Sequence, residues 1–154
     1  GTDAMRAEII NDVAREVLGN WKPEQTSLLV VGHGSGKNAC SKQSLLGHLQ
    51  EVRNNTDFAQ VADLWLEELP LVSSWKEVAT KRQIIVIPYL LNDGQHGGWD
   101  IPEELGLPLD QPIHAQTHDV EGCQIRLTAA LGTSPRFAEV ISQLAEIWGQ
   151  TSGQ

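Results

Sequence analysis

The stretch Ser27-Leu28-Leu29-Val30-Val31-Gly32-His33-Gly34 decides the fold that we expect for this chain. A short apolar run that ends in glycine is typical of a strand buried on both faces of a parallel sheet. A polar, glycine-rich loop follows at 32–37, and residues 38–52 then place leucine and valine side chains on one side of a helix. The stretch therefore predicts a strand, a tight loop and a helix, which together open an α/β unit.

The rest of the chain repeats this alternation of strand and helix. Apolar residues at helical spacing predict further helices over 5–18, 70–79 and 100–105, and from Ser134 to about 148. Short apolar runs predict strands over 58–66, 83–89 and 124–131, whereas 112–118 fits either a loop or an extra strand. We therefore predict a three-layer, Rossmann-like α/β fold, with a mainly parallel sheet of four to five strands and helices on both faces.

Length and composition exclude several classes of protein. The chain has 154 residues and a formal net charge of −9, which suits one globular domain and disfavours nucleic-acid binding, because phosphate contacts need a basic surface. We find no signal peptide and no apolar run of about 18 residues that would predict a membrane helix. Cys40 and Cys123 form no CxxC pair, which favours a reducing compartment, so we expect a cytoplasmic protein.

We expect three segments along the chain. Residues 1–26 form an N-terminal helix and linker, with 1–4 interpreted as a cloning remnant before Met5. Residues 27–150 form the α/β domain, and residues 151–154 form a polar tail.

The loop Gly32-His33-Gly34-Ser35-Gly36-Lys37-Asn38 does not match two common catalytic loops. A phosphate loop needs four residues between its glycines and a serine or threonine after the lysine, but three residues separate Gly32 from Gly36 and Asn38 follows the lysine. A nucleophile elbow needs glycine two residues before and two residues after the serine, positions held here by His33 and Lys37. Glycines that simply make a tight turn would explain the loop, but not the histidine within it.

Two histidines follow predicted strands, and this is the main functional signal. His33 follows the strand at 27–31, and His96 lies in the polar loop after the strand at 83–89. Ligands of α/β proteins bind beyond the carboxyl ends of the strands. If these two strands are neighbours, about 4.8 Å apart, both imidazoles can reach one point and leave positions open on a Co²⁺, Ni²⁺, Fe²⁺ or Zn²⁺ ion.

Other polar and aromatic residues have two interpretations each. Glu67 and Glu68 make either a solvated turn or a carboxylate beside the histidines, and Trp99 either packs on the sheet or offers its ring face to a flat ligand. We interpret His114 and His118 as structural, because in a strand they stand about 13 Å apart. His48 is expected at the surface or half-buried on the helix that follows the first strand.

The chain resembles the small class II chelatases, the sirohydrochlorin cobaltochelatases of the CbiX type. Leu28–Ser35, which reads LLVVGHGS, resembles the opening of this family. Pro88–His96, with its Gly-x-His ending, resembles the second signature, and Asp100-Ile101-Pro102 continues it. Leu131-Gly132 with Pro135 resembles the element before the family's last helix, so the resemblance runs from Leu28 to Trp148.

The resemblance implies a chelatase-like fold and a lyase that inserts a divalent metal into sirohydrochlorin or a related tetrapyrrole of cobalamin biosynthesis without a nucleotide. The metal would be Co²⁺ or Ni²⁺, with Fe²⁺ as a further alternative. His33 and His96 would bind the metal, and Glu67 or Glu68 would act as acid and base. Two such lobes face each other in the family, which implies a homodimer or a fused second lobe. The alternative is a non-catalytic metal- or tetrapyrrole-binding domain, or one lobe of a longer chelatase.

Basic and aromatic side chains would hold the tetrapyrrole. Trp99 would meet the flat ring, and the candidates for contacting the ring carboxylates are Lys37, Lys42, Arg126 and Arg136. Because the net charge of −9 repels a polycarboxylate at long range, we expect these basic residues to gather at the cleft. No nucleic acid or membrane is expected as a partner.

Overall fold

The computed structural model describes residues 2–34, 39–90, 94, 99–114 and 116–135. Five strands form one sheet in the order β2-β1-β3-β5-β4. They are β1 (Thr26–Gly32), β2 (Gln60–Trp65), β3 (Gln83–Pro88), β4 (His118–Val120) and β5 (Cys123–Leu127). All neighbouring pairs are parallel except β4 with β5, which confirms the predicted α/β fold with a mainly parallel sheet.

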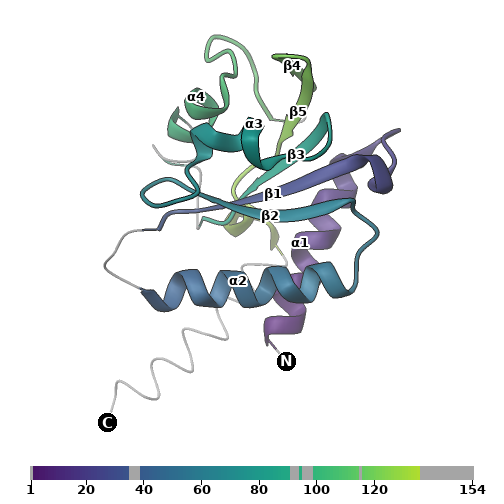
Figure 1. Ribbon diagram of the computed structural model, residues 1–154, viewed down its shortest axis with the longest axis vertical. Helices are drawn as coiled ribbons and strands as arrows, with labels where there is room; N and C mark the ends of the chain where they lie inside the picture. The colour runs from purple at the N-terminus through teal and green to yellow at the C-terminus, as the bar shows by residue number, and fades with distance from the viewer. Residues whose placement is uncertain (1, 35–38, 91–93, 95–98, 115, 136–154) are drawn as a thin grey trace.

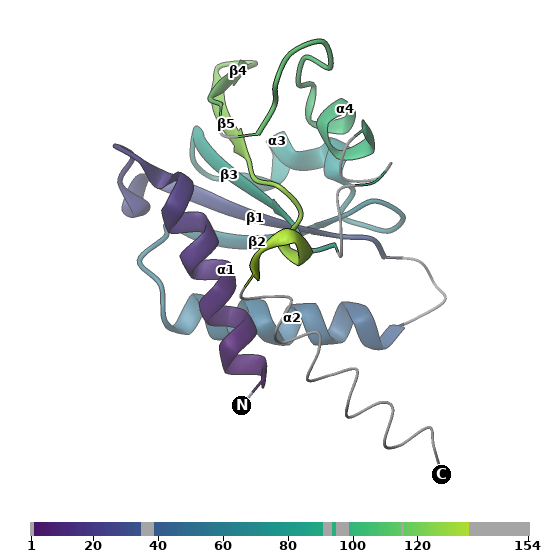
Figure 2. The ribbon, with the colours of Figure 1, turned by 180° about the vertical axis from the view of Figure 1, so that it is seen from behind.

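Helices cover both faces of the sheet (Figures 1 and 2). The long helices α1 (Thr2–Leu18) and α2 (Ala39–Asn54) lie on one face, and the short helices α3 (Trp75–Val78) and α4 (Ile101–Leu105) lie on the other. Three 3₁₀ turns complete the described elements: η1 (Pro23–Gln25), η2 (Val72–Ser74) and η4 (Leu131–Thr133).

The central strands β1 and β3 are buried on both faces. Leu28 and Val30 of β1 belong to the core beneath α1 and α2, whereas Leu29 and Val31 belong to the core beneath α3 and α4. All four side chains have no solvent exposure. Successive side chains of a strand point to opposite faces, so a strand between two helical layers needs an unbroken apolar run, and this is the pattern that the sequence shows.

The helix expected from Pro70 begins later than predicted. The Trp65 N–H donates to the Pro70 carbonyl at 2.8 Å, and Leu71 forms an isolated bridge with Trp65. Since β2 is an edge strand, its last amide needs a partner from outside the sheet, and Pro70 provides it. Helical structure therefore starts only at Val72.

The ambiguous segment 112–118 is a strand only at its last residue. The β4 strand starts at His118 and is joined to β5 by Glu121 and Gly122, whose φ angles are +50° and +83°. Two left-handed residues make the tight turn that suits a two-residue hairpin. The helix expected after Ser134 lies beyond the described residues, which end at 135.

Helix α1 is anchored to the sheet at its C-terminal end by Arg126 of β5. The guanidinium donates through Nη1 to the carbonyls of Val17 and Leu18, at 2.9 and 2.8 Å, and stacks 3.7 Å from the centroid of the Trp21 ring. Burial lowers the pKa of Arg126, yet arginine stays protonated at neutral pH.

Among the described helices, none has the length and apolarity needed to cross a membrane.

Candidate active site

The order of the strands brings the predicted histidine loops together. β1 pairs in parallel with β3 on one side and with β2 on the other, so the adjacency expected of the strands that carry His33 and His96 is confirmed. Val31 is in register with Pro88, and the Tyr89 N–H donates to the Val31 carbonyl at 2.7 Å. His96 itself lies outside the described residues.

On the other side of β1, the parallel ladder continues past the ends of both strands. The Leu66 N–H donates to the Gly32 carbonyl and the Glu67 N–H to the His33 carbonyl, both at 3.1 Å. These two bonds hold the turn after β2 alongside the loop after β1. They place the Glu67 backbone directly beside that of His33.

The side chains of His33 and Glu67 also approach each other. His33 Nδ1 lies 3.7 Å from Glu67 Oε2, and the two side chains are 38% and 48% exposed. This separation is longer than a hydrogen bond, but it is short enough for the carboxylate to attract a protonated imidazole or a nearby cation. A half-exposed imidazole beside a carboxylate can accept either a proton or a metal ion from solvent.

Glu68 occupies a different position from Glu67. Its Oε2 lies 3.4 Å from Lys42 Nζ, and a Cβ atom built on Gly34 would lie 2.7 Å from its Oε1. Glu68 is therefore held by Lys42 against the loop, whereas Glu67 faces His33. The structure therefore distinguishes the two carboxylates, whereas the sequence alone did not indicate which of them lies beside the histidine.

Trp65 explains why glycines flank His33. A Cβ atom on Gly32 would lie 2.3 Å from Cζ3 of the Trp65 ring, and one on Gly34 would lie 3.0 Å from its Cε3. Gly34 also has a φ angle of +73°, which favours glycine. The buried indole of Trp65 thus needs close backbone approach at both positions, and no phosphate is needed to explain the glycines.

The predicted aromatic and basic contacts are only partly described. The Trp99 side chain is 58% exposed, which favours an accessible ring over one that packs fully against the sheet. Lys37 and Arg136 lie outside the described residues. Lys42 donates to the Leu69 carbonyl at 2.9 Å as well as approaching Glu68.

The position of Arg126 contradicts the expected gathering of basic residues at the cleft. It is in register with Ile85, and Ile85 with Leu28, so it lies four residues before the Gly32 end of the strands, a distance of about 13 Å. Its Nη1 donates to two carbonyls of α1, and its Nε donates to Thr117 Oγ1 at 2.8 Å. Arg126 is therefore a capping residue for α1 rather than a contact for ring carboxylates.

The remaining histidines lie in structural positions. His118 is 8% exposed with Nε2 3.0 Å from the Ile113 carbonyl, and His114 Nδ1 lies 3.4 Å from the Leu127 carbonyl. His48 is 2% exposed, so its expected surface or half-buried position is wrong. Its Nδ1 lies 3.3 Å from the Tyr89 hydroxyl, a contact that lets a polar ring be buried.

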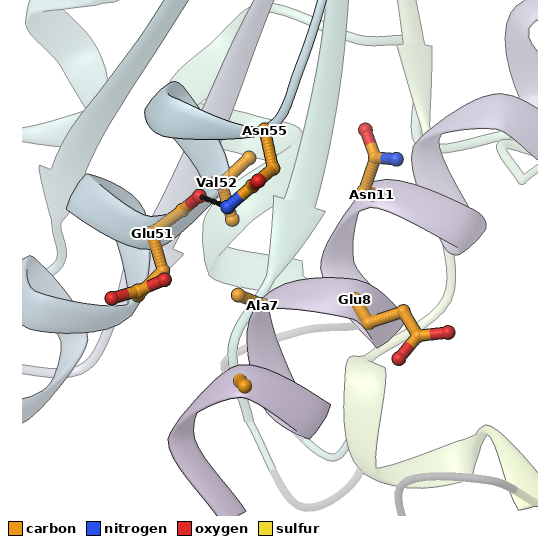
Figure 3. Close-up of a pocket in the computed structure, with 7 residues that line it drawn as sticks. Ala7, Glu8, Asn11, Glu51, Val52 and Asn55 are labelled. Carbon is orange, nitrogen blue, oxygen red and sulfur yellow. Dashed lines mark hydrogen bonds between the residues drawn. The ribbon is translucent and has the colours of Figure 1, made fainter. Parts of the chain in front are cut away.

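A cavity of about 270 Å³ lies between α1 and α2, away from His33. Its lining includes Glu8 and Glu51, whose carboxylates point away from each other in Figure 3. The cavity lies where α2 ends, so it is at the opposite end of α2 from the His33 loop.

Within the described part of the chain, no group of three or more His, Cys, Asp or Glu side chains could hold a metal ion.

Comparison with known proteins assigns the chain to a family. The family model CbiX matches residues 27–147, so the chain belongs to the CbiX family, and the resemblance found in the sequence is confirmed. A curated relative from Halobacterium salinarum, a probable sirohydrochlorin cobaltochelatase, is 30% identical over 99% of this chain. The chain spans 53% of the length of that relative.

Two solved structures share the fold. The SirB protein from Bacillus subtilis, solved with Fe³⁺, has a TM-score of 0.69 at 18% identity and matches all of this chain over 57% of its own length. The protein DR2241 from Deinococcus radiodurans, described as a multi-domain protein with structural similarity to chelatases, has a TM-score of 0.66 at 22% identity. The alignment covers 93% of this chain and 29% of DR2241.

Proposed function

We propose that this chain belongs to an enzyme, a lyase, that inserts Co²⁺ or Ni²⁺ into sirohydrochlorin or a related tetrapyrrole of cobalamin biosynthesis without a nucleotide. The observation that carries this proposal is the half-exposed His33–Glu67 pair, separated by 3.7 Å at the carboxyl ends of adjacent parallel strands. Family membership supports metal chelation, and the name of the Halobacterium relative favours cobalt and sirohydrochlorin.

The chemistry of insertion suits this pair. Two pyrrole N–H protons must leave the ring as the metal ion loses its ligands and passes to the ring nitrogens. An imidazole can bind the metal ion, or it can accept a proton near neutral pH. Glu67 would orient the His33 ring, and it would relay the two pyrrole protons one after the other to solvent.

Several residues complete the proposed site. His96 would be the second metal ligand, since its loop follows the strand next to β1. The exposed ring of Trp99 would meet the face of the tetrapyrrole, and Lys37 and Arg136 would contact ring carboxylates.

We also infer a second lobe, because the chain spans about half of the Halobacterium relative. The lobe would be either a second copy in a homodimer or a fused domain, and the mass in solution distinguishes a dimer from a single copy. The two cysteines, which form no CxxC pair, support a cytoplasmic location.

The test is insertion followed by absorption. The protein is mixed with sirohydrochlorin and Co²⁺ or Ni²⁺, and the spectral change is compared with the spontaneous rate. Acceleration that is lost in His33→Ala and in His96→Ala, but kept in a His114→Ala control, supports the proposal. Metal binding in calorimetry without acceleration would instead support a binding domain, and absence of both metal and tetrapyrrole binding would overturn both functions.

A further inference from the structure

We propose that Lys42 is a positioning residue that holds the turn carrying Glu67, so that the Glu67 carboxylate stays beside His33. This inference rests on the proposed function. It gives Lys42 a role other than contact with ring carboxylates. The argument starts from three contacts that the ammonium group makes with the end of β2 and the turn that follows it.

The Lys42 ammonium is surrounded by groups from a single segment of chain. Nζ donates to the Leu69 carbonyl at 2.9 Å, lies 3.4 Å from Glu68 Oε2, and sits 5.1 Å from the centroid of the Trp65 ring. The side chain is 29% exposed. A lysine ammonium has three donors, and a carbonyl, a carboxylate and a ring face together suit one well.

This arrangement connects α2 to the turn after β2. Lys42 lies near the start of α2, which is a packed helix, whereas Leu69 is 74% exposed. Little apolar burial therefore stabilises the tip of the turn. The two polar contacts from Lys42 are the described interactions that tie Glu68 and Leu69 to the helical layer.

The position of this turn determines where Glu67 lies. The Glu67 N–H donates to the His33 carbonyl, and the side chain of Glu68, the next residue, would lie 2.7 Å from a Cβ built on Gly34. The turn thus touches both the catalytic candidate His33 and the glycine that follows it. If the turn moves away from the loop, the 3.7 Å approach of Glu67 to His33 is lost.

The experiment compares Lys42→Met with Lys76→Met and Lys42→Arg. Methionine keeps most of the apolar stem but removes the charge and the donors. Lys76 is a matched control, because it too lies beside a glutamate, with Nζ 3.8 Å from Glu121 Oε1, but on α3. Arginine restores both the charge and the donors.

We expect Lys42→Met to lower kcat for metal insertion about tenfold, in the range seen for groups that orient metal ligands, with KM for the tetrapyrrole unchanged. Lys76→Met should match the wild type, and Lys42→Arg should recover most of the lost kcat. A raised KM with unchanged kcat would show that Lys42 binds the tetrapyrrole instead, and an unchanged kcat and KM would also overturn the proposal.

Amide hydrogen exchange provides a readout that does not depend on activity. Protection of the Glu67 amide should fall in Lys42→Met and remain in Lys76→Met and Lys42→Arg, because this amide bonds to the His33 carbonyl. If the wild type fails to accelerate insertion, the proposed function fails, and exchange still decides whether Lys42 holds the turn. Unchanged protection of Glu67 would overturn the role of Lys42 even in an active enzyme.

Discussion

His33 and His48 carry the same side chain in opposite surroundings. His33 follows the carboxyl end of the central strand β1, is 38% exposed and faces Glu67 at 3.7 Å. His48 lies within α2, is 2% exposed and has its Nδ1 3.3 Å from the Tyr89 hydroxyl. The Arg6 guanidinium donates to the same hydroxyl at 3.4 Å. The residue type is the same in both places. What distinguishes the candidate metal ligand from the buried polar contact is the solvent exposure of its side chain and its position just after the carboxyl end of a strand.

The strongest test of this comparison is His33→Ala. We expect insertion of Co²⁺ to fall at least about a hundredfold, since a positioned acid–base group contributes at least that much. The free energy of unfolding should stay within about 0.5 kcal/mol of the wild type, because the side chain is partly exposed. Absorption kinetics and denaturant unfolding measure the two effects. Retained insertion would remove His33 from the site.

Glu67→Gln tests the carboxylate of the pair. The amide keeps the shape but loses the charge, so we expect insertion to fall about 10- to 100-fold, as for a lost partner of a metal ligand. Glu51→Gln at the far end of α2 is the matched control and should have no effect on the rate. Equal rates in Glu67→Gln and Glu51→Gln would leave His33 without its proposed partner.

His48→Ala should show the reverse of His33→Ala. Removing the buried ring leaves a cavity and takes a partner from the Tyr89 hydroxyl, so we expect a loss of about 2 kcal/mol in the free energy of unfolding. The insertion rate measured well below the melting temperature should remain near that of the wild type. A large loss of insertion in a folded His48→Ala protein would contradict the division between the two histidines.

The smallest effect is expected for Arg126→Met. Loss of the bonds to Val17 and Leu18 should lower the free energy of unfolding by about 1 kcal/mol, with KM for the tetrapyrrole unchanged. Denaturant unfolding and steady-state kinetics check the two quantities. A raised KM would return Arg126 to the list of groups that contact ring carboxylates.

Much of the fold could be predicted from the sequence because strong local patterns agree with the global structure. The apolar runs at 27–31 and 83–89 predicted strands that are buried on both faces. In the structure these are the adjacent strands β1 and β3. The start of the helix after Pro70 could not be predicted in this way. It depends on the Trp65 N–H at the sheet edge, which donates a hydrogen bond to the Pro70 carbonyl. Such a bond leaves no periodic pattern of apolar residues in the sequence.

The site was predictable only in outline. The histidine after β1 has a sequence signal, because it stands between glycines at the end of an apolar run. The choice between Glu67 and Glu68 has none, because it is made by Lys42 on another element. The burial of His48 was missed for the same reason, since its partner Tyr89 is 41 residues away in the sequence.

Titration of the ¹³C,¹⁵N-labelled protein with Co²⁺, followed by NMR, tests the central claim most directly. Co²⁺ is paramagnetic, so it shifts or broadens the signals of the groups closest to it. We predict that the first signals affected are the ring of His33 and the carboxylate of Glu67, while the ring of His48 is much less perturbed. Titration that leaves the His33 ring unperturbed, or that acts first on His48, would contradict the account.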